Sequence, residues 1–266
     1  MAKADKNLKE FYNSRGWHKK NNDTHYQDSV LWEDNREAAK EYVSKCRLRL
    51  AHKINKNDNY SNYSLSLDVG CGPIQYEEYN QYYNRFDENH FLDISQKALD
   101  EAKNNARPNS KFICQSAVKF DEKNKYDLIL CNHALYHMDR FDQKKVIQNM
   151  ISGLKSKSKL YITYTNRYSI WNFIFFLPQK IFNLFKSENR KIYFYTHPIS
   201  WWRQFNKEYN LKIYPLRTIS SRESKLLIPN NSIGKKLFSY LYDFEDKYPK
   251  LSLYLGTYYI VEIEKE

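Results

Sequence analysis

The chain has few of the residues that would assign it to a secreted, metal-binding or membrane-anchored class. Its 266 residues include only 4 cysteines and 6 glycines. No two cysteines stand in a Cys-x-x-Cys spacing, so we expect neither disulfides nor a metal site. Residues 1–10 are polar and contain no apolar run. We therefore expect no signal peptide or anchor, and a cytoplasmic protein.

Negative charge is also scarce, because 43 lysines and arginines face 31 acidic residues, which gives a formal net charge of +12. Such an excess can indicate nucleic-acid binding. The lysines here are dispersed within a general bias toward Lys, Asn and Tyr, so we expect no nucleic-acid partner. The charge could still attract an acidic substrate or a peripheral contact with an anionic membrane. Nothing in the composition indicates an oligomeric state.

Because glycine is scarce, two glycines one residue apart are informative. Residues 65–73 read LSLDVGCGP and place Asp68 two residues before Gly70, with Gly72 following. This pattern predicts a buried strand and a tight turn, where a ligand can approach the backbone and the positive end of the next helix. A dinucleotide fingerprint needs a third glycine at the position of Gln75. An acidic residue at position 68 instead suits a ligand that carries an ammonium group.

Further apolar segments follow in alternation with helical patterns. They predict strands at 89–93, 111–115, 126–131, 159–165, 211–219 and 257–263, and helices at 34–53, 143–154, 198–209 and 233–247. Asp93 ends the second strand, where a carboxylate can accept both ribose hydroxyls of an adenosine ligand. Ser95 is placed to cap the helix that follows.

Together these segments resemble class I S-adenosylmethionine (SAM) methyltransferases. Residues 132–137, NHALYH, resemble the segment after the fourth strand in small-molecule enzymes related to the ubiquinone/menaquinone methyltransferase group (methyltransferase type 11-like). The resemblance covers about residues 64–166 and departs from the family at 154–158, where Leu-Lys-Pro-Gly-Gly is usual. It implies an α/β fold with a doubly wound, Rossmann-like sheet of seven strands in the order 3-2-1-4-5-7-6, the last strand antiparallel.

The resemblance implies SAM as the cofactor, with S-adenosylhomocysteine (SAH) as the product. The residues that it places at the cofactor lie at or after the ends of the first four strands. They are Asp68, Gly70, Cys71, Gly72, Pro73, Asp93, Ile94, Ser116, Ala117, Asn132 and His133.

The resemblance also implies a division of the chain into an N-terminal helical cap or lid, residues 1–60, and a SAM-binding domain, residues 61–266. Residues 167–210 would form an acceptor-site insertion. Polar and aromatic candidates for acceptor contact are Tyr12, Trp17, Trp32, Tyr136, Tyr164, Asn166, Arg167 and His197. For the first three, simple packing against the core is the alternative. The apolar run at 170–185 is too short to span a bilayer and predicts an acceptor cover or a peripheral membrane helix.

Methyl transfer from a sulfonium depends mainly on orientation and on the exclusion of water. A base is needed only where the acceptor must lose a proton. His133 and His137 are the candidate catalytic residues, and the alternative is that His133 lines the cofactor pocket while His137 packs locally. Their spacing is that of His-Glu-x-x-His, but Ala134 replaces the glutamate and excludes a zinc-protease motif.

The chain lacks the Asn/Asp-Pro-Pro-Tyr motif of enzymes that methylate nucleobase or glutamine amides. We therefore predict a methyltransferase that acts on oxygen or nitrogen of a small molecule such as a metabolite, a sugar or a phosphorylated intermediate. One alternative is a C-methyltransferase of a membrane-borne ring or lipid. Another is a non-catalytic SAM-binding subunit that activates a partner.

Overall fold

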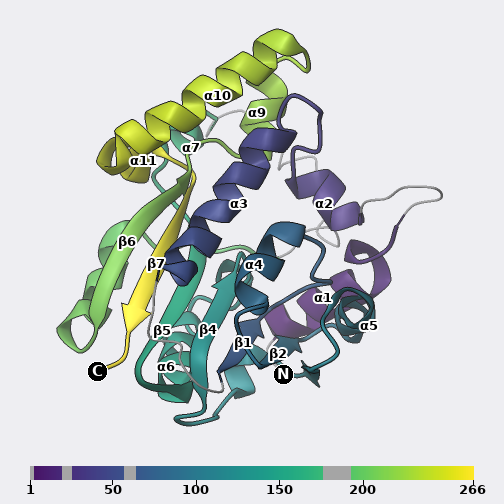
Figure 1. The fold of residues 1–266 in the computed structure, drawn as a ribbon, viewed down its shortest axis with the longest axis vertical. Helices are drawn as coiled ribbons and strands as arrows, with labels where there is room; N and C mark the ends of the chain where they lie inside the picture. Colours follow the sequence, from purple (N-terminus) through teal and green to yellow (C-terminus); the bar gives the residue numbers. More distant parts are fainter. Residues whose placement is uncertain (1–2, 20–25, 57–63, 176–192) are drawn as a thin grey trace.

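A seven-stranded sheet forms the centre of the computed structural model, which describes residues 3–19, 26–56, 64–175 and 193–266 (Figure 1). The strands are β1 (Leu65–Val69), β2 (Glu88–Asp93), β3 (Ser110–Cys114), β4 (Tyr126–Asn132), β5 (Leu154–Thr165), β6 (Asn210–Arg217) and β7 (Tyr258–Glu264). Their order is β3-β2-β1-β4-β5-β7-β6, and only β7 pairs antiparallel with its neighbours. The predicted fold class and strand order are confirmed.

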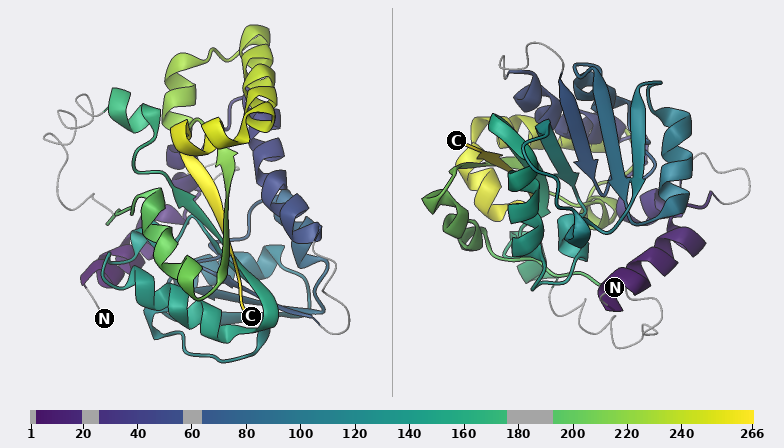
Figure 2. Two further views of the ribbon diagram at one scale, coloured as in Figure 1. Left: turned by 90° about the vertical axis from the view of Figure 1, so that its left-hand side faces the viewer. Right: turned by 90° about the horizontal axis from the view of Figure 1, so that it is seen from below.

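Helices cover both faces of this sheet. On one side lie α6 (Gln143–Gly153) and the 3-10 helix η6 (Ile199–Lys207), and on the other lies α3 (Lys40–Asn55) (Figure 2). Alternate residues of a strand point to opposite faces, so Ile129 of β4 packs in the α6 layer and Leu130 in the α3 layer. Both are fully buried, as expected for a central parallel strand.

The other helices join the strands or extend the two ends of the sheet. They are α1 (Lys3–Phe11), the π-helix η1 (Tyr12–Gly16), α2 (Gln27–Trp32), α4 (Asn80–Tyr83), α5 (Gln96–Asn105), α7 (Ile170–Ile174), α9 (Ser221–Leu227), α10 (Ser232–Lys247), α11 (Pro249–Leu255) and the short 3-10 helices η2 (Glu77–Tyr79), η3 (Ala117–Lys119) and η4 (Leu135–His137). Ser95 caps α5 as predicted, because its side chain accepts a hydrogen bond from the Ala98 N–H. Within the described residues, no helix is both long and apolar enough to cross a bilayer.

Several boundaries differ from the prediction. Helix α3 begins at Lys40 rather than at residue 34, because the preceding residues form a separate polar network with α9. Strand β5 begins at Leu154 rather than at residue 159, and Lys157 there adopts a positive φ of 61°. Helices α9 and α11 were not predicted. Residues 176–185 of the apolar run lie outside the described residues.

The N-terminal segment reaches the loops at the carboxyl edge of the sheet. We call residues 3–19 and 26–32 the cap. Its side-chain hydrogen bonds to those loops join Asp5 Oδ2 to Ser116 Oγ (2.6 Å), Asn13 Oδ1 to Ser95 Oγ (2.6 Å) and Ser29 Oγ to Gln75 Oε1 (2.7 Å). By contrast α3, which also falls within residues 1–60, contributes Leu50 and Ile54 to the core of the sheet.

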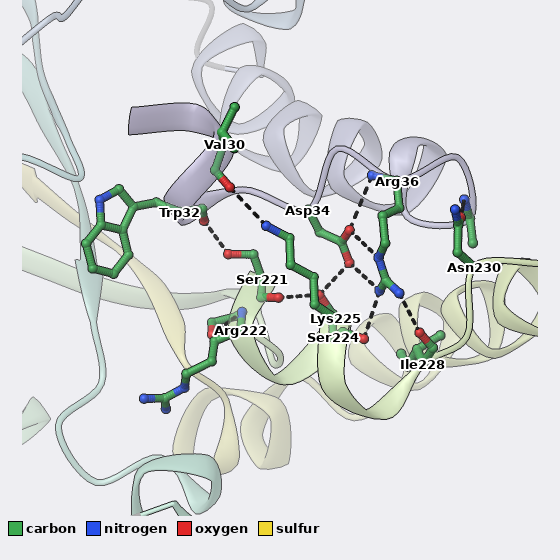
Figure 3. Close-up of polar contacts among 12 residues, drawn as sticks. Val30, Trp32, Asp34, Arg36, Ser221, Arg222, Ser224, Lys225, Ile228 and Asn230 are labelled. Carbon is green, nitrogen blue, oxygen red and sulfur yellow. Dashed lines mark hydrogen bonds and ion pairs between the residues drawn. The ribbon is translucent and has the colours of Figure 1, made fainter. Parts of the chain in front are cut away.

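A buried carboxylate fixes the chain between the cap and α3 to α9 (Figure 3). Asp34 accepts hydrogen bonds from Arg36 Nε (2.7 Å), Arg36 Nη2 (2.7 Å) and Ser224 Oγ (2.6 Å). Arg36 also donates to the backbone carbonyls of Ser224 and Ile228 at the end of α9. Burial acts to raise the pKa of Asp34, but the hydrogen bonds from Arg36 and Ser224 hold it below its usual value.

Replacing this carboxylate, as in Asp34→Asn, should lower the free energy of unfolding by about 1.5–3 kcal/mol at neutral pH, the scale of hydrogen bonds to a charged group. Since the folded-state pKa lies below the unfolded one, the ionised carboxylate contributes stability that is lost as the pH falls through the folded-state value. The difference between wild type and variant should therefore shrink below about pH 4. Urea denaturation of wild type and variant, at neutral pH and below about pH 4, measures this difference in the free energy of unfolding.

The matched control is Glu37→Gln. Glu37 pairs with Lys235 of α10 at 3.0 Å, so it also joins this part of the chain to the C-terminal helices, but both side chains are exposed. Exposed pairs contribute little, so this variant should unfold like the wild type. Equal loss of stability in the two variants would contradict the account.

Candidate cofactor and acceptor site

The turn after β1 has two glycines that let neighbouring segments lie close to its backbone. Gly70 and Gly72 have φ values of 74° and 58°, in the left-handed region that favours glycine. A Cβ on Gly70 would lie 2.4 Å from the Ala134 Cβ, and one on Gly72 would lie 3.3 Å from the Trp17 ring. The Gly70 N–H also donates to the Leu92 carbonyl at 2.7 Å. The turn is therefore packed against β2, the segment after β4 and the cap.

Two buried carboxylates flank this turn. Asp93 accepts hydrogen bonds from the backbone N–H groups of Gly72 (3.0 Å) and Ser95 (2.8 Å). Asp68 accepts one from the Tyr83 hydroxyl, while its Oδ1 is buried without a hydrogen-bond partner among the described residues. Burial raises the pKa of each carboxyl to about 6, and Asp93 adds to the effect at Asp68. A cationic ligand would stabilise both carboxylates.

A donor without a partner lies at the same turn. Trp17 stacks on Tyr12 with ring centroids 4.8 Å apart, and its ring lies over Gly72. The Trp17 Nε1–H group is buried and has no acceptor among the described residues. The turn thus offers an acceptor at Asp68 and a donor at Trp17. An amino-acid group, with its ammonium and its carboxylate, fits this pair.

The remaining residues predicted for the cofactor also lie at the carboxyl ends of the first four strands. They are Cys71 and Pro73 after β1, Ile94 after β2, Ser116 and Ala117 after β3, and Asn132 at the end of β4. Ser116 is held by Asp5 of the cap, and Asn132 Oδ1 accepts from Thr163 Oγ1 at 2.9 Å. The cap therefore covers the edge on which these residues lie.

His133 follows β4 in a strained conformation. Its φ is 56°, which for a residue other than glycine costs about 1–3 kcal/mol and occurs often at functional sites. Nδ1 lies 3.1 Å from the Tyr136 hydroxyl, and the ring packs edge-on against Tyr258. Burial is the main cause that lowers the pKa of His133 to about 3, and the positive charges of Arg217 and Arg47 contribute to this shift. The imidazole is therefore neutral at physiological pH.

A small cavity of about 40 Å³ adjoins His133. Its walls come from the region before α3, from α3 itself, from the segment after β1, and from the ends of β4, β5 and β6 or the residues that follow them. The lining residues are Glu33, Val43, Cys46, Arg47, Leu50, Tyr79, His133, Thr163, Leu216 and Arg217. Of these only His133 was predicted as a site residue. The others belong to no local motif, and only the fold brings them together.

Comparison with known proteins shows the family and the fold of the chain. A family model described as a methyltransferase domain matches residues 61–212. The chain belongs to this methyltransferase family. The fold is similar to magnesium protoporphyrin IX methyltransferase from Synechocystis PCC 6803 with bound SAH, at a TM-score of 0.62 and 14% identity over 99% of this chain and 100% of that one.

A second similar structure is the N-methyltransferase NodS from Bradyrhizobium japonicum WM9 in complex with SAH. It has a TM-score of 0.54 and 10% identity over 92% of this chain and 93% of that one. A search of curated proteins by sequence finds no significant match. Because the sequence identities are this low, the likeness to these structures shows that the methyltransferase shares their fold.

The acceptor candidates of the methyltransferase separate into two groups. Tyr12, Trp17 and Tyr136 are next to the glycine turn or to His133. Most of the rest lie elsewhere or have their polar atoms engaged in the fold, whereas His197 Nε2 is buried without a hydrogen-bond partner among the described residues. Trp32 is 55% exposed, Tyr164 donates to Gln143 (2.7 Å), Asn166 donates to the Tyr254 and Gly256 carbonyls, Arg167 donates to the Thr196 carbonyl, and His197 stacks on Trp201.

His137 is placed differently from His133. Its Nδ1 lies 3.1 Å from the Tyr193 carbonyl, and its ring packs against Phe194 and Tyr136. Burial lowers its pKa to about 4. It is not among the described residues that line the cavity. Of the two histidines, His133 is therefore the one that lines the described cavity.

Adding one methyl group at the centre of the site, as in Gly70→Ala, should disrupt the turn. The new Cβ would lie 2.4 Å from Ala134, and the positive φ adds strain. We expect a loss of about 1–3 kcal/mol in the free energy of unfolding, together with weaker SAH binding in calorimetry.

Gly153→Ala provides the control, because its Cβ would lie 3.0 Å from the Phe120 ring at the other edge of the sheet. It should reduce stability while leaving SAH affinity unchanged. If Gly70→Ala bound SAH as tightly as Gly153→Ala does, the turn would not be the ligand site.

Proposed function

We propose that this protein transfers the methyl group of SAM to oxygen or nitrogen of a small-molecule acceptor, such as a metabolite, a sugar or a phosphorylated intermediate. The observation that carries the proposal is a pair of buried atoms at the glycine turn, Asp68 Oδ1 and Trp17 Nε1, which have no hydrogen-bond partner among the described residues. They complement the ammonium and carboxylate groups at the methionine end of SAM. When bound, SAM supplies an electrophilic methyl group.

The rest of the turn suits the adenosine end of the same cofactor. Asp93 is held by two backbone N–H groups and keeps lone pairs that can accept from ribose hydroxyls. Ser116 and Ala117 follow β3, where the family commonly contacts adenine. The buried rings of Trp17 and Tyr26 in the cap pack against Ala98 of α5 and exclude water from this edge.

His133 is the residue best placed to act on the acceptor. When its Nδ1–H donates to the Tyr136 hydroxyl oxygen, Nε2 is left free to take a proton from an O–H or N–H group. Burial keeps the imidazole neutral before the acceptor binds. A base is required only where the acceptor loses its proton in or before the transfer.

One observation favours the alternative of a membrane-borne ring or lipid as the acceptor. Apolar side chains are exposed on α7 and near it, and Phe173 is 85% exposed. The others are Tyr168, Ile170 and Ile174. An exposed apolar group of this kind can contact a membrane surface. Co-sedimentation with liposomes that depended on Phe173 would support this alternative over a freely soluble acceptor.

The proposal predicts that the protein labels a small molecule when it is incubated with methyl-labelled SAM and a protein-free metabolite extract. His133→Ala should lower the turnover by roughly 10²–10⁴-fold while leaving SAH affinity nearly unchanged. Mass spectrometry of the labelled product and calorimetry with SAH measure the two quantities.

His137→Ala is the comparison variant, because His137 contacts Tyr193 rather than the cavity. It should retain most of the turnover. A fall in turnover and SAH affinity together in His133→Ala would assign His133 to the cofactor pocket instead. Tight SAH binding with no labelled product in any metabolite or lipid extract would favour a non-catalytic subunit.

A further inference from the structure

Arg217 lies in the cavity beside His133. The fold does not explain the role of this cation. Arg217 ends β6 opposite Tyr258 of β7, and its guanidinium lies 5.0 Å from the centre of the Tyr258 ring. The same ring contacts His133 edge-on at 5.1 Å. Arg217, Tyr258 and His133 therefore form one continuous wall at the carboxyl edge of the sheet.

Arg217 differs from the neighbouring arginines in its ion pairs. Arg47 pairs with Glu33 and with Glu78, and it stacks over Tyr76. Arg49 pairs with Glu245 at 2.5 Å and with Asp246 at 2.7 Å. Among the described residues, no carboxylate forms an ion pair with Arg217. The Glu33 carboxylate in the same cavity attracts Arg217, but its ion pair is with Arg47. A half-buried guanidinium without an ion-pair partner among the described residues can therefore bind an anion supplied from outside.

We propose that Arg217 binds an anionic group, a carboxylate or a phosphate, on the molecule that accepts the methyl group. The inference rests on the proposed function and narrows its substrate class. A guanidinium can hold such a group through two parallel hydrogen bonds. The cavity of about 40 Å³ has room for a compact polar group rather than for a ring system. When its anionic group is bound to Arg217, the rest of the methyl-accepting molecule lies next to His133.

The backbone around Arg217 is fixed on both sides, as a binding residue requires. The Leu216 carbonyl accepts a hydrogen bond from Arg49 at 2.7 Å. Thr218 donates to the buried Glu245 carboxylate through its N–H (2.7 Å) and through its hydroxyl (2.5 Å). Glu245 is thus occupied by Arg49 and Thr218, and it holds Arg217 in place without neutralising it.

The electrostatics of His133 agree with an anion at this position. After burial, the charges of Arg217 and Arg47 are the next causes that lower the His133 pKa. An anion bound at Arg217 would offset that effect and make the imidazole a stronger base. The anionic group of the bound substrate would therefore make His133 a better base for the proton that the same substrate loses. The basic net charge of the chain, +12, would also favour the approach of an anionic molecule.

The test uses the full chain saturated with SAH and titrates it with inorganic phosphate or acetate at constant ionic strength. The readout is the NMR signal of the His133 imidazole, assigned with His133→Gln. We expect a saturable shift at millimolar anion in the wild type. Arg217→Met should weaken the anion affinity by at least about tenfold. Arg203→Met, an exposed arginine on η6 across the sheet, should leave it unchanged.

SAH binding is measured first, because it distinguishes failure of the proposed function from failure of the proposed role of Arg217. Failure of the wild type to bind SAH would overturn the proposed function itself. Normal SAH binding with no anion-dependent shift, or with equal anion affinity in Arg217→Met, would overturn only the role of Arg217. If Arg217→Met does not fold, Arg217→Gln replaces it, since glutamine keeps a hydrogen-bond donor but removes the charge. Wild-type anion affinity in that variant would equally contradict the inference.

Discussion

The contact between Gly70 and Ala134 is the constraint on which the rest of the site depends. β1 and β4 are neighbours in the sheet, and the turns that follow them meet where a Cβ on Gly70 would lie 2.4 Å from the Ala134 Cβ. Because no side chain separates them, the first turn directs its Gly72 N–H to Asp93, and the second places His133 at the cavity. The positive φ of His133 is a cost of this arrangement.

The two sides of the site differ in electrostatic character. On the side of β1 and β2, burial raises the pKa values of Asp68 and Asp93, so this side favours a cation. On the side of β4 and β6, burial and two arginines lower the pKa of His133, so this side favours an anion. SAM carries an ammonium and a sulfonium, which suit the first side. A methyl acceptor with a carboxylate or a phosphate would suit the second side.

The sequence predicted those parts of the molecule that short local patterns specify. The strand order was implied by the family resemblance, and the turn at Gly70 was predicted from two glycines separated by one residue in a chain that has few. Asp68 and Asp93 could be proposed as cofactor residues because Asp68 lies near the end of β1 and Asp93 ends β2, both beside that turn. Arg217 and Tyr79 could not be found, since their position depends on how β6 and the segment after β1 pack around α3. Likewise, aromatic character alone did not distinguish exposed Trp32 from buried Trp17.

A crystal structure of the protein with SAH tests the central claim most directly. The account predicts electron density for SAH across the carboxyl ends of β1 and β2. The ammonium should lie within hydrogen-bond distance of Asp68 Oδ1, the ribose hydroxyls should lie on Asp93, and the sulfur should point toward His133. SAH bound away from the glycine turn, or bound there with Asp68 Oδ1 still unpartnered, would contradict the account.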